Sequence, residues 1–312
     1  MPFANVDVVV LSPSFSVHPQ LRSELLHHFP KTRFNEVRRN RSADEILELI
    51  GNADAVIPGT EKITRDIIMK LPNVKFMSKY GVGTDNIDLD ALKERGIPFG
   101  CSGGVNKRSV SELALCFMLG LCRNVLFSGV EIKKGEWNKF GGRQLSEKTV
   151  GIIGCGHIGT DLIQLLQPFK CRILVNDIVD KSSVCKELGA KQVSLDLLLA
   201  ESDVVSLHLP LDASTKLMVN ESFLKKMKRG AFLINTARGG LVQEHHLLRA
   251  VEAKSIMGAA IDVLHEEPPT DRSLVDHPRI FTTPHIGGNA DEAVLAMGRS
   301  AIEHLVNFYS KK

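Results

Sequence analysis

The sequence has little excess charge of either sign and no long apolar run. Lys and Arg together number 39 and Asp and Glu 36, which leaves a net charge of +3 without a tail or stripe of one sign. This balance argues against nucleic acid as the main partner. The longest apolar run, residues 113–122, is ten residues long, whereas a helix needs roughly 20 to cross a bilayer. The sequence therefore predicts no membrane span.

The cysteines lack the spacing that disulfide frameworks and zinc sites require. There are six, with no CxxC pair and no histidine at metal-ligand spacing, so we expect reduced packing thiols and no metal. They are Cys101, Cys116, Cys122, Cys155, Cys171 and Cys185. The N-terminus has neither the cationic start nor the apolar length of a secretion signal, which predicts a cytoplasmic protein.

Short apolar runs alternate with amphipathic stretches along the whole chain, whose 312 residues correspond to about two domains. This alternation is typical of α/β proteins, in which helices cover parallel sheets. The first set of expected strands covers residues 6–11, 33–37, 54–58, 75–79 and 97–101. The second set covers residues 149–154, 173–177, 204–209, 231–237, 259–263 and 280–283.

Two longer helical patterns flank the second set of strands. Residues 106–126 are apolar around most of a helix circumference, which predicts one helix buried on several sides, between domains or subunits. Residues 291–309 form an amphipathic pattern that we expect to pack back onto the first strand set. The first domain would then be discontinuous, with residues 1–103 and 290–312 in one domain and 104–289 in the other.

The strongest cofactor signal is the sequence GCGHIG, which follows a buried-strand run and precedes helical periodicity. In a GxGxxG turn, the first glycine permits the turn, the second lets the backbone approach a pyrophosphate, and the third lets helix and strand pack closely. The following helix N-terminus offers N–H groups to phosphate. We therefore assign five residues of this turn to a dinucleotide: Gly154, Gly156, His157, Ile158 and Gly159.

An acid at the end of the next strand distinguishes NAD from NADP. Asp177 stands 18 residues past Gly159, where a carboxylate accepts hydrogen bonds from the adenosine ribose and repels a 2′-phosphate. No arginine follows in residues 178–180, so the sequence favours NAD. The alternatives are a purely structural turn with a strand-capping Asp177, and a methyltransferase that binds adenosine on a similar sheet.

Three strand ends of the second sheet carry side chains suited to carbonyl chemistry. Arg238 follows one predicted strand, Asp262 ends the next and His285 follows the third, with Glu267 in the loop between the last two. Because open α/β sheets bind ligands at the carboxyl ends of their strands, we expect these groups to meet. The alternative is a solvated loop arginine and an ordinary packed or solvated histidine.

This set supplies what reduction of a carbonyl requires. The guanidinium of Arg238 grips a carboxylate in two places and polarises the neighbouring carbonyl. While hydride reaches carbon, the oxygen needs a proton, which His285 is suited to donate. Glu267 beside His285 would favour the charged imidazolium. Asp262 is a candidate to orient the nicotinamide carboxamide.

These residues resemble the D-2-hydroxyacid dehydrogenase family, which includes phosphoglycerate dehydrogenases, over nearly the whole chain. The shared motifs run in order: YGVGTDNID at residues 80–88, Asn106 with SVSE at 109–112, GEW at 135–137, the glycine turn, NTARGG at 235–240, residues 262–268 and Pro284 with His285. The resemblance implies a Rossmann domain inserted in a flavodoxin-like substrate domain and a cleft that closes over substrate. It also implies a dimer formed through the cofactor domains. The chain ends at Lys312, so we expect the short form without a regulatory domain.

The resemblance also implies roles for residues. Arg238 binds the substrate carboxylate, His285 is the acid/base, and Glu267, which directly precedes proline, is its partner rather than Glu266. The backbone N–H groups of Val82 and Gly83 complete the carboxylate site. The remaining candidates are Lys79 and Tyr80 for substrate, and Thr236, Ala237, Asp262, Gly287 and Gly288 for NAD.

The leading hypothesis is an NAD-dependent enzyme that interconverts a D-2-hydroxy acid and its 2-oxo acid. Residues 58–61 read PGTE, where many phosphoglycerate dehydrogenases carry a basic residue, so this loop has no phosphate clamp. Lys79 is a remaining source of positive charge. Phosphite dehydrogenases use the same Arg, Glu and His types and are the second hypothesis, whereas formate dehydrogenases carry Gln in place of Glu267. The third is an NADH-sensing binding protein of the corepressor type.

Overall fold

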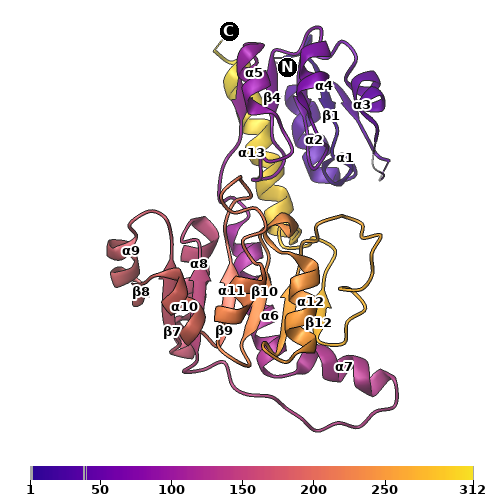
Figure 1. Cartoon of the computed structure of the whole chain (residues 1–312). Helices are drawn as coiled ribbons and strands as arrows, with labels where there is room; N and C mark the ends of the chain where they lie inside the picture. Colours follow the sequence, from indigo (N-terminus) through magenta and orange to yellow (C-terminus); the bar gives the residue numbers. More distant parts are fainter. Residues whose placement is uncertain (1–2, 38, 40, 312) are drawn as a thin grey trace. The chain divides into compact units, whose positions relative to one another are not determined.

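The structure is a computed structural model that describes residues 3–37, 39 and 41–311. Its contacts divide the chain into two compact units, Met1–Asn106 with Ala290–Lys312, and Lys107–Asn289 (Figure 1). The boundary expected after residue 103 therefore lies three residues later, at Asn106. We describe each unit by itself.

The first unit contains a five-stranded parallel sheet in the order β2-β1-β3-β4-β5, which is the flavodoxin-like order. Its strands are β1 (Asp7–Val10), β2 (Lys31–Phe34), β3 (Ala55–Ile57), β4 (Phe76–Ser78) and β5 (Phe99–Gly100). Its helices are α1 (Pro13–Ser16), α2 (Pro19–His28), α3 (Ala43–Ile50), α4 (Arg65–Lys70), α5 (Leu89–Glu94) and α13 (Asp291–Tyr309).

The C-terminal helix α13 belongs to the first unit although it is far from it in sequence. Its apolar side chains Met297, Ala301 and Leu305 share one buried cluster with Val8 and Val10 of β1. The hydroxyl of Ser78 in β4 also donates to the carbonyl oxygen of Ala301 at 2.8 Å. The amphipathic helix expected at residues 291–309 therefore covers this sheet, as the yellow helix beside the indigo elements in Figure 1.

The second unit contains a seven-stranded parallel sheet in the order β12-β11-β10-β9-β6-β7-β8, a Rossmann order with one added strand. Its strands are β6 (Thr149–Ile153), β7 (Arg172–Asn176), β8 (Ala190–Gln192), β9 (Val204–Leu207), β10 (Phe232–Asn235), β11 (Gly258–Ile261) and β12 (Ile280–Thr282). Its helical segments are α6 (Lys107–Cys122), α7 (Val125–Lys133), α8 (His157–Leu166), η1 (Gln167–Phe169), α9 (Ser182–Glu187), α10 (Leu195–Glu201), α11 (Glu221–Lys226), η2 (Gly239–Leu241) and α12 (Glu244–Glu252). The sequence analysis missed the edge strand β8, since its residues AKQ show no apolar run.

The single helix predicted over residues 106–126 is wrong, because the chain breaks between α6 and α7. Asn124 adopts a left-handed conformation with φ of 55°. The carbonyl oxygen of Cys122 accepts the N–H of Arg143 at 2.8 Å and does not continue the helix. α6 is buried against α8, β10 and β11, whereas α7 has no buried residue.

No single helix in the described ranges is long and apolar enough to cross a membrane. Helices α6 and α7 meet the length and composition criteria only as a pair, and that pair is bent by 65°.

Candidate active site

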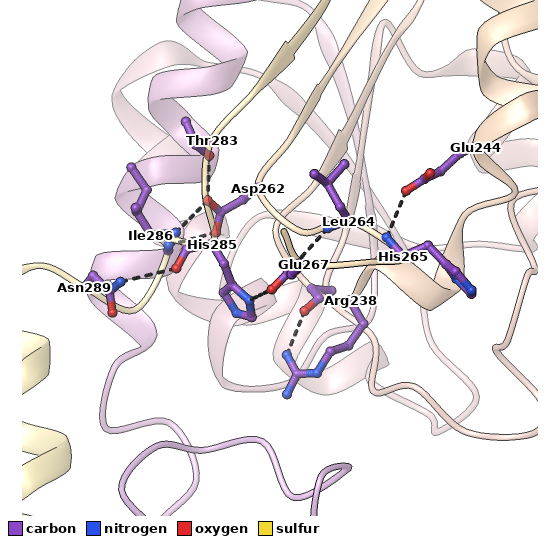
Figure 2. Close-up of polar contacts among 12 residues, drawn as sticks. Arg238, Glu244, Asp262, Leu264, His265, Glu267, Thr283, His285, Ile286 and Asn289 are labelled. Carbon is purple, nitrogen blue, oxygen red and sulfur yellow. Dashed lines mark hydrogen bonds and ion pairs between the residues drawn. The ribbon is translucent and has the colours of Figure 1, made fainter. Parts of the chain in front are cut away.

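Three neighbouring strands of the second unit bring the predicted catalytic residues to one edge of the sheet. β10, β11 and β12 lie side by side in parallel, so their carboxyl ends face the same way. Arg238 follows β10, Asp262 follows β11 and His285 follows β12. Figure 2 shows the ring of His285 directed at the carboxylate of Glu267, with Arg238 on the adjoining loop.

His285 and Glu267 form a hydrogen-bonded ion pair. Nδ1 of His285 lies 2.7 Å from Oε2 of Glu267, and the two side chains are 43% and 38% exposed. The bond to Glu267 raises the pKa of His285 above 6.5, although burial opposes the shift. Burial raises the pKa of Glu267, but the bond and charge of His285 outweigh it and leave this pKa below 4.5. Each member of the pair therefore stabilises the charged form of the other.

Arg238 is half-buried and acts electrostatically on both members of this pair. Its positive charge lowers the pKa of Glu267 and that of His285, and its Nη1 donates to the carbonyl oxygen of Ala237 at 2.7 Å. The fully buried Asn235 holds the backbone of Ala237 and Arg238 through two hydrogen bonds. Its Oδ1 accepts the N–H of Ala237 at 3.0 Å, and its Nδ2 donates to the carbonyl oxygen of Arg238 at 2.8 Å.

The loops that carry Arg238 and Glu267 are pressed together at Gly239. A Cβ atom at Gly239 would lie 2.0 Å from the carbonyl oxygen of Leu264, so only glycine fits. The N–H of Leu264 donates to Oε1 of Glu267 at 2.9 Å, and the N–H of His265 donates to Oε1 of Glu244 in α12 at 2.9 Å. Glu244 thus anchors the Glu267 loop. This role of Glu244 and that of Asn235 cannot be predicted from the sequence, because both depend on hydrogen bonds made only in the folded chain.

Asp262 holds the backbone that carries His285. It is 1% exposed, and its Oδ1 accepts the hydroxyl of Thr283 at 2.6 Å and the N–H of Ile286 at 2.8 Å. Its Oδ2 accepts the N–H of Gly287 at 2.8 Å, while its carbonyl oxygen accepts the N–H of His285 at 2.9 Å. We expected Asp262 to orient a nicotinamide carboxamide. In the structure its carboxylate binds the turn that follows β12, and its role toward the nicotinamide stays a prediction.

The glycine turn between β6 and α8 fits a dinucleotide diphosphate. Gly154 has φ of 95°, and a Cβ atom there would lie 2.4 Å from the carbonyl oxygen of His208. At Gly159 a Cβ atom would lie 2.2 Å from the carbonyl oxygen of Gly154. A Cβ atom at Gly156, by contrast, would have no described residue other than its chain neighbours within 4 Å. The open side at Gly156, the N-cap residue of the ten-residue helix α8, leaves room for phosphate at the N–H groups of the helix.

Asp177 lies half-buried at the end of β7, beside this turn. Its Oδ2 accepts the N–H of Cys155 at 2.8 Å and its Oδ1 accepts the N–H of Val179 at 2.9 Å. These bonds fix the carboxylate next to the glycine turn. The placement suits an acid that meets the adenosine ribose of a bound dinucleotide.

Two buried polar atoms at the ends of β9 and β10 also suit a bound cofactor. Nδ1 of His208 and Oγ1 of Thr236 have no hydrogen-bond partner within the part of the chain that the structure describes. Burial lowers the pKa of His208 to about 4, so its imidazole is neutral near pH 7. The sequence predicts a cofactor role for Thr236 but not for His208, which lies inside the strand predicted over residues 204–209 and directly follows the observed strand β9.

The substrate candidates of the first unit differ in their surroundings. The ammonium of the buried Lys79 donates to the carbonyl oxygen of Gly59 and, at 2.9 Å, to Oδ1 of Asn86. Tyr80 is a core residue, 7% exposed, whose hydroxyl lies 3.2 Å from Oγ of Ser14. Lys79 and Tyr80 therefore have structural contacts of their own.

The half-buried loop that follows Tyr80 presents backbone donors. Among the described residues, the N–H groups of Val82 and Gly83 donate to no other protein group.

Comparison with known proteins gives one consistent result. The family described as D-isomer specific 2-hydroxyacid dehydrogenase, NAD binding domain, matches residues 115–287. Hydroxypyruvate reductase of Thermotoga maritima is 36% identical over 84% of this chain and 87% of that protein. D-3-phosphoglycerate dehydrogenase of Bacillus subtilis is 32% identical over 94% of this chain and 56% of its own length. The chain spans about half the length of the phosphoglycerate dehydrogenases that it matches.

A solved structure agrees with these relatives. D-lactate dehydrogenase from Aquifex aeolicus, complexed with NAD and lactic acid, matches 98% of this chain and 96% of its own, with a TM-score of 0.85 and 27% identity.

The chain belongs to the D-isomer specific 2-hydroxyacid dehydrogenase family. It is an NAD-dependent oxidoreductase that interconverts a D-2-hydroxy acid and its 2-oxo acid. The family, the α/β fold class and the NAD cofactor predicted from the sequence are thereby confirmed.

The geometry predicts that Glu267→Gln lowers the pKa of His285. Removing the carboxylate charge leaves a neutral amide at Nδ1, so the imidazolium loses the interaction that raises its pKa. The pKa is measured by NMR titration of the imidazole, with His285→Ala to assign its signal.

The matched control is Glu266→Gln, because Glu266 is adjacent in sequence but its Oε2 accepts the N–H of Thr270 at 3.3 Å. An equal fall of the His285 pKa in both variants would contradict the pairing with Glu267.

Proposed function

We propose that Arg238, Glu267 and His285 carry the reduction of a small 2-oxo acid and its reverse. The observation that carries this proposal is the 2.7 Å pair of His285 and Glu267 at the strand edge where Arg238 also emerges. The charges of these three residues act on one another there, and the charge of Asp262 also raises the pKa of His285.

His285 supplies the proton. Because its Nδ1 is bonded to Glu267, Nε2 is the nitrogen that faces the substrate oxygen. The NAD nicotinamide, when bound, supplies or accepts the hydride at carbon. In reduction the imidazolium donates its Nε2 proton to the carbonyl oxygen, and in oxidation neutral His285 removes the hydroxyl proton. Glu267 stabilises the imidazolium in both directions.

Arg238 binds the substrate carboxylate through its planar guanidinium. We further propose that the N–H groups of Val82 and Gly83 bind a substrate carboxylate. Their lack of a protein acceptor among the described residues supports this role. Cofactor contacts are proposed for the glycine turn, Asp177, Thr236, Ala237, Gly287 and Gly288. Asp262 acts indirectly, because its carboxylate holds the turn that carries His285.

A small acid without phosphate is the proposed substrate. In the loop after β3, Oε2 of Glu61 accepts the N–H of Gly59 at 2.7 Å, so a carboxylate stands where a phosphate clamp would need a cation. Lys79, the neighbouring cation, binds Gly59 and Asn86. The similarity to a protein named hydroxypyruvate reductase is consistent with this choice.

A substrate panel tests the proposal. The purified chain is incubated with NADH and hydroxypyruvate, glyoxylate, pyruvate or 3-phosphohydroxypyruvate, and in reverse with NAD and phosphite, while cofactor absorbance is followed. Highest kcat/KM on an unphosphorylated 2-oxo acid supports the proposal. Preference for 3-phosphohydroxypyruvate would overturn the substrate, and turnover of phosphite alone would overturn the reaction.

His285→Ala is expected to lower kcat by about 10²- to 10⁴-fold, because the carbonyl oxygen loses its proton donor. NADH binding, followed by fluorescence titration, should stay within about twofold, since the glycine turn lies on other strands of the sheet. Equal losses of turnover and of NADH affinity would show that His285 is not the acid.

Asp177→Asn is expected to move the ratio of kcat/KM values from NADH toward NADPH, because the repulsion of a 2′-phosphate is removed. The matched control is Asp180→Asn, whose exposed carboxylate instead accepts the N–H of Ser182 at 2.9 Å. The assignment fails if Asp177→Asn leaves the ratio unchanged.

We also propose that the chain works in the cytoplasm as a homodimer. Its six free cysteines suit a reducing compartment. Exposed apolar side chains concentrate on α7 and the following loop, where Val125, Trp137 and Phe140 are 62%, 77% and 56% exposed. Such a concentration suits a contact with a second copy.

Light scattering after gel filtration is expected to give twice the chain mass of 34.3 kDa. Trp137→Ser should shift the mass toward the monomer, because it removes exposed apolar area from the contact. A wild-type monomer at all concentrations would contradict the dimer.

A further inference from the structure

We propose that Ser109 of α6 is a positioning residue for His285. Its hydroxyl holds residues 283–289, here called the histidine turn, against the start of the helix. This inference rests on the proposed role of His285 as the acid/base. Nothing in the sequence motifs assigns Ser109 such a role.

The contact that carries the inference is made at Gly287. The hydroxyl of Ser109 donates to the carbonyl oxygen of Gly287 at 2.6 Å, while the N–H of Gly287 donates to Oδ2 of Asp262 at 2.8 Å. A Cβ atom at Gly287 would lie 2.9 Å from that Oδ2 and 3.7 Å from side-chain atoms of Val110 and Leu113. Gly287 is therefore fixed between the end of β11 and α6.

The histidine turn needs this support because His285 has an unfavourable backbone conformation. Its φ of 55° lies in the left-handed region, which is unfavourable for a residue with a Cβ atom. The direction of its exposed ring depends on the backbone of the turn. Asn289 adds a weaker tie, since its Nδ2 donates to the carbonyl oxygen of His285 at 3.3 Å. Loosening Gly287 therefore frees the peptide segment that aims the imidazole.

Ser109 and Gly287 also stand near the two points at which the chain passes between the units. The first passage lies between Asn106 and Lys107, and the second between Asn289 and Ala290. The hydrogen bond therefore ties together, within the second unit, two residues that lie close in sequence to these two passages. We infer that the catalytic histidine is aimed by α6 as well as by the strand that precedes it.

The test compares Ser109→Ala with Ser109→Thr, which retains a hydroxyl, in the full chain. For Ser109→Ala we expect kcat to fall about tenfold with KM within about twofold, because the proton donor is displaced from the carbonyl oxygen. The pKa of His285 should move down toward 6.5, since the bond to Glu267 is made for less of the time. Ser109→Thr should restore both values.

Ser111→Ala is the matched control on the same helix. The hydroxyl of Ser111 donates to Oδ2 of the buried Asp161 at 2.6 Å and does not contact the histidine turn. This variant should lower the melting temperature and leave the pKa of His285 in place. A melting temperature lowered in Ser109→Ala without a change in that pKa, or an equal pKa shift in Ser111→Ala, overturns the inference.

The NMR titration needs no substrate, so it separates this inference from the proposed function. Absence of turnover in the wild-type chain would defeat the proposed function alone. An unchanged pKa in Ser109→Ala would defeat the positioning role alone.

Discussion

The buried carboxylate of Asp262 is the constraint on which the catalytic geometry depends. It binds the hydroxyl of Thr283 and the N–H groups of Ile286 and Gly287, and so closes the chain into a turn directly after β12. A buried carboxylate is tolerated because hydrogen bonds replace its lost hydration. The same bonds hold His285 in its left-handed conformation. Without them, the imidazole would not stay beside Glu267.

The charges around His285 act against one another. Glu267 and Asp262 raise its pKa, while burial and the positive charge of Arg238 lower it. The balance is a raised pKa, because the direct bond to Glu267 is the strongest contribution. This balance suits the proposed acid/base role, since reduction needs the imidazolium and the reverse oxidation needs the neutral imidazole. The proposed binding of a carboxylate by Arg238 is thus compatible with a raised pKa of His285.

The sequence predicted those parts of the molecule that local patterns determine. The buried strands, the glycine turn and the strand-end positions of Arg238, Asp262 and His285 all follow from apolar runs and from the rule that parallel strands share a carboxyl edge. The break between α6 and α7 did not, because it depends on Arg143 binding the carbonyl oxygen of Cys122 from a distant segment.

The second set of contacts in the site was also hidden from sequence patterns. Asp262 was expected to face the cofactor, yet its position in the sequence does not reveal that Thr283 and Gly287 fold back onto it. Asn235 acts on backbone groups through two hydrogen bonds and Glu244 through one, and no residue spacing predicts these bonds. The chemistry was thus easier to predict than the supports that aim it.

The most direct test of the account is the pH dependence of kcat/KM for NADH-dependent reduction of hydroxypyruvate. In the proposed mechanism, reduction requires protonated His285, whose pKa is raised above 6.5. The account therefore predicts that kcat/KM for reduction is constant at low pH and falls as pH rises through this raised pKa. The kcat/KM for the reverse oxidation should rise over the same range. A reduction rate that increases with pH there, or that shows no such limb, would contradict the assignment of His285 as the acid.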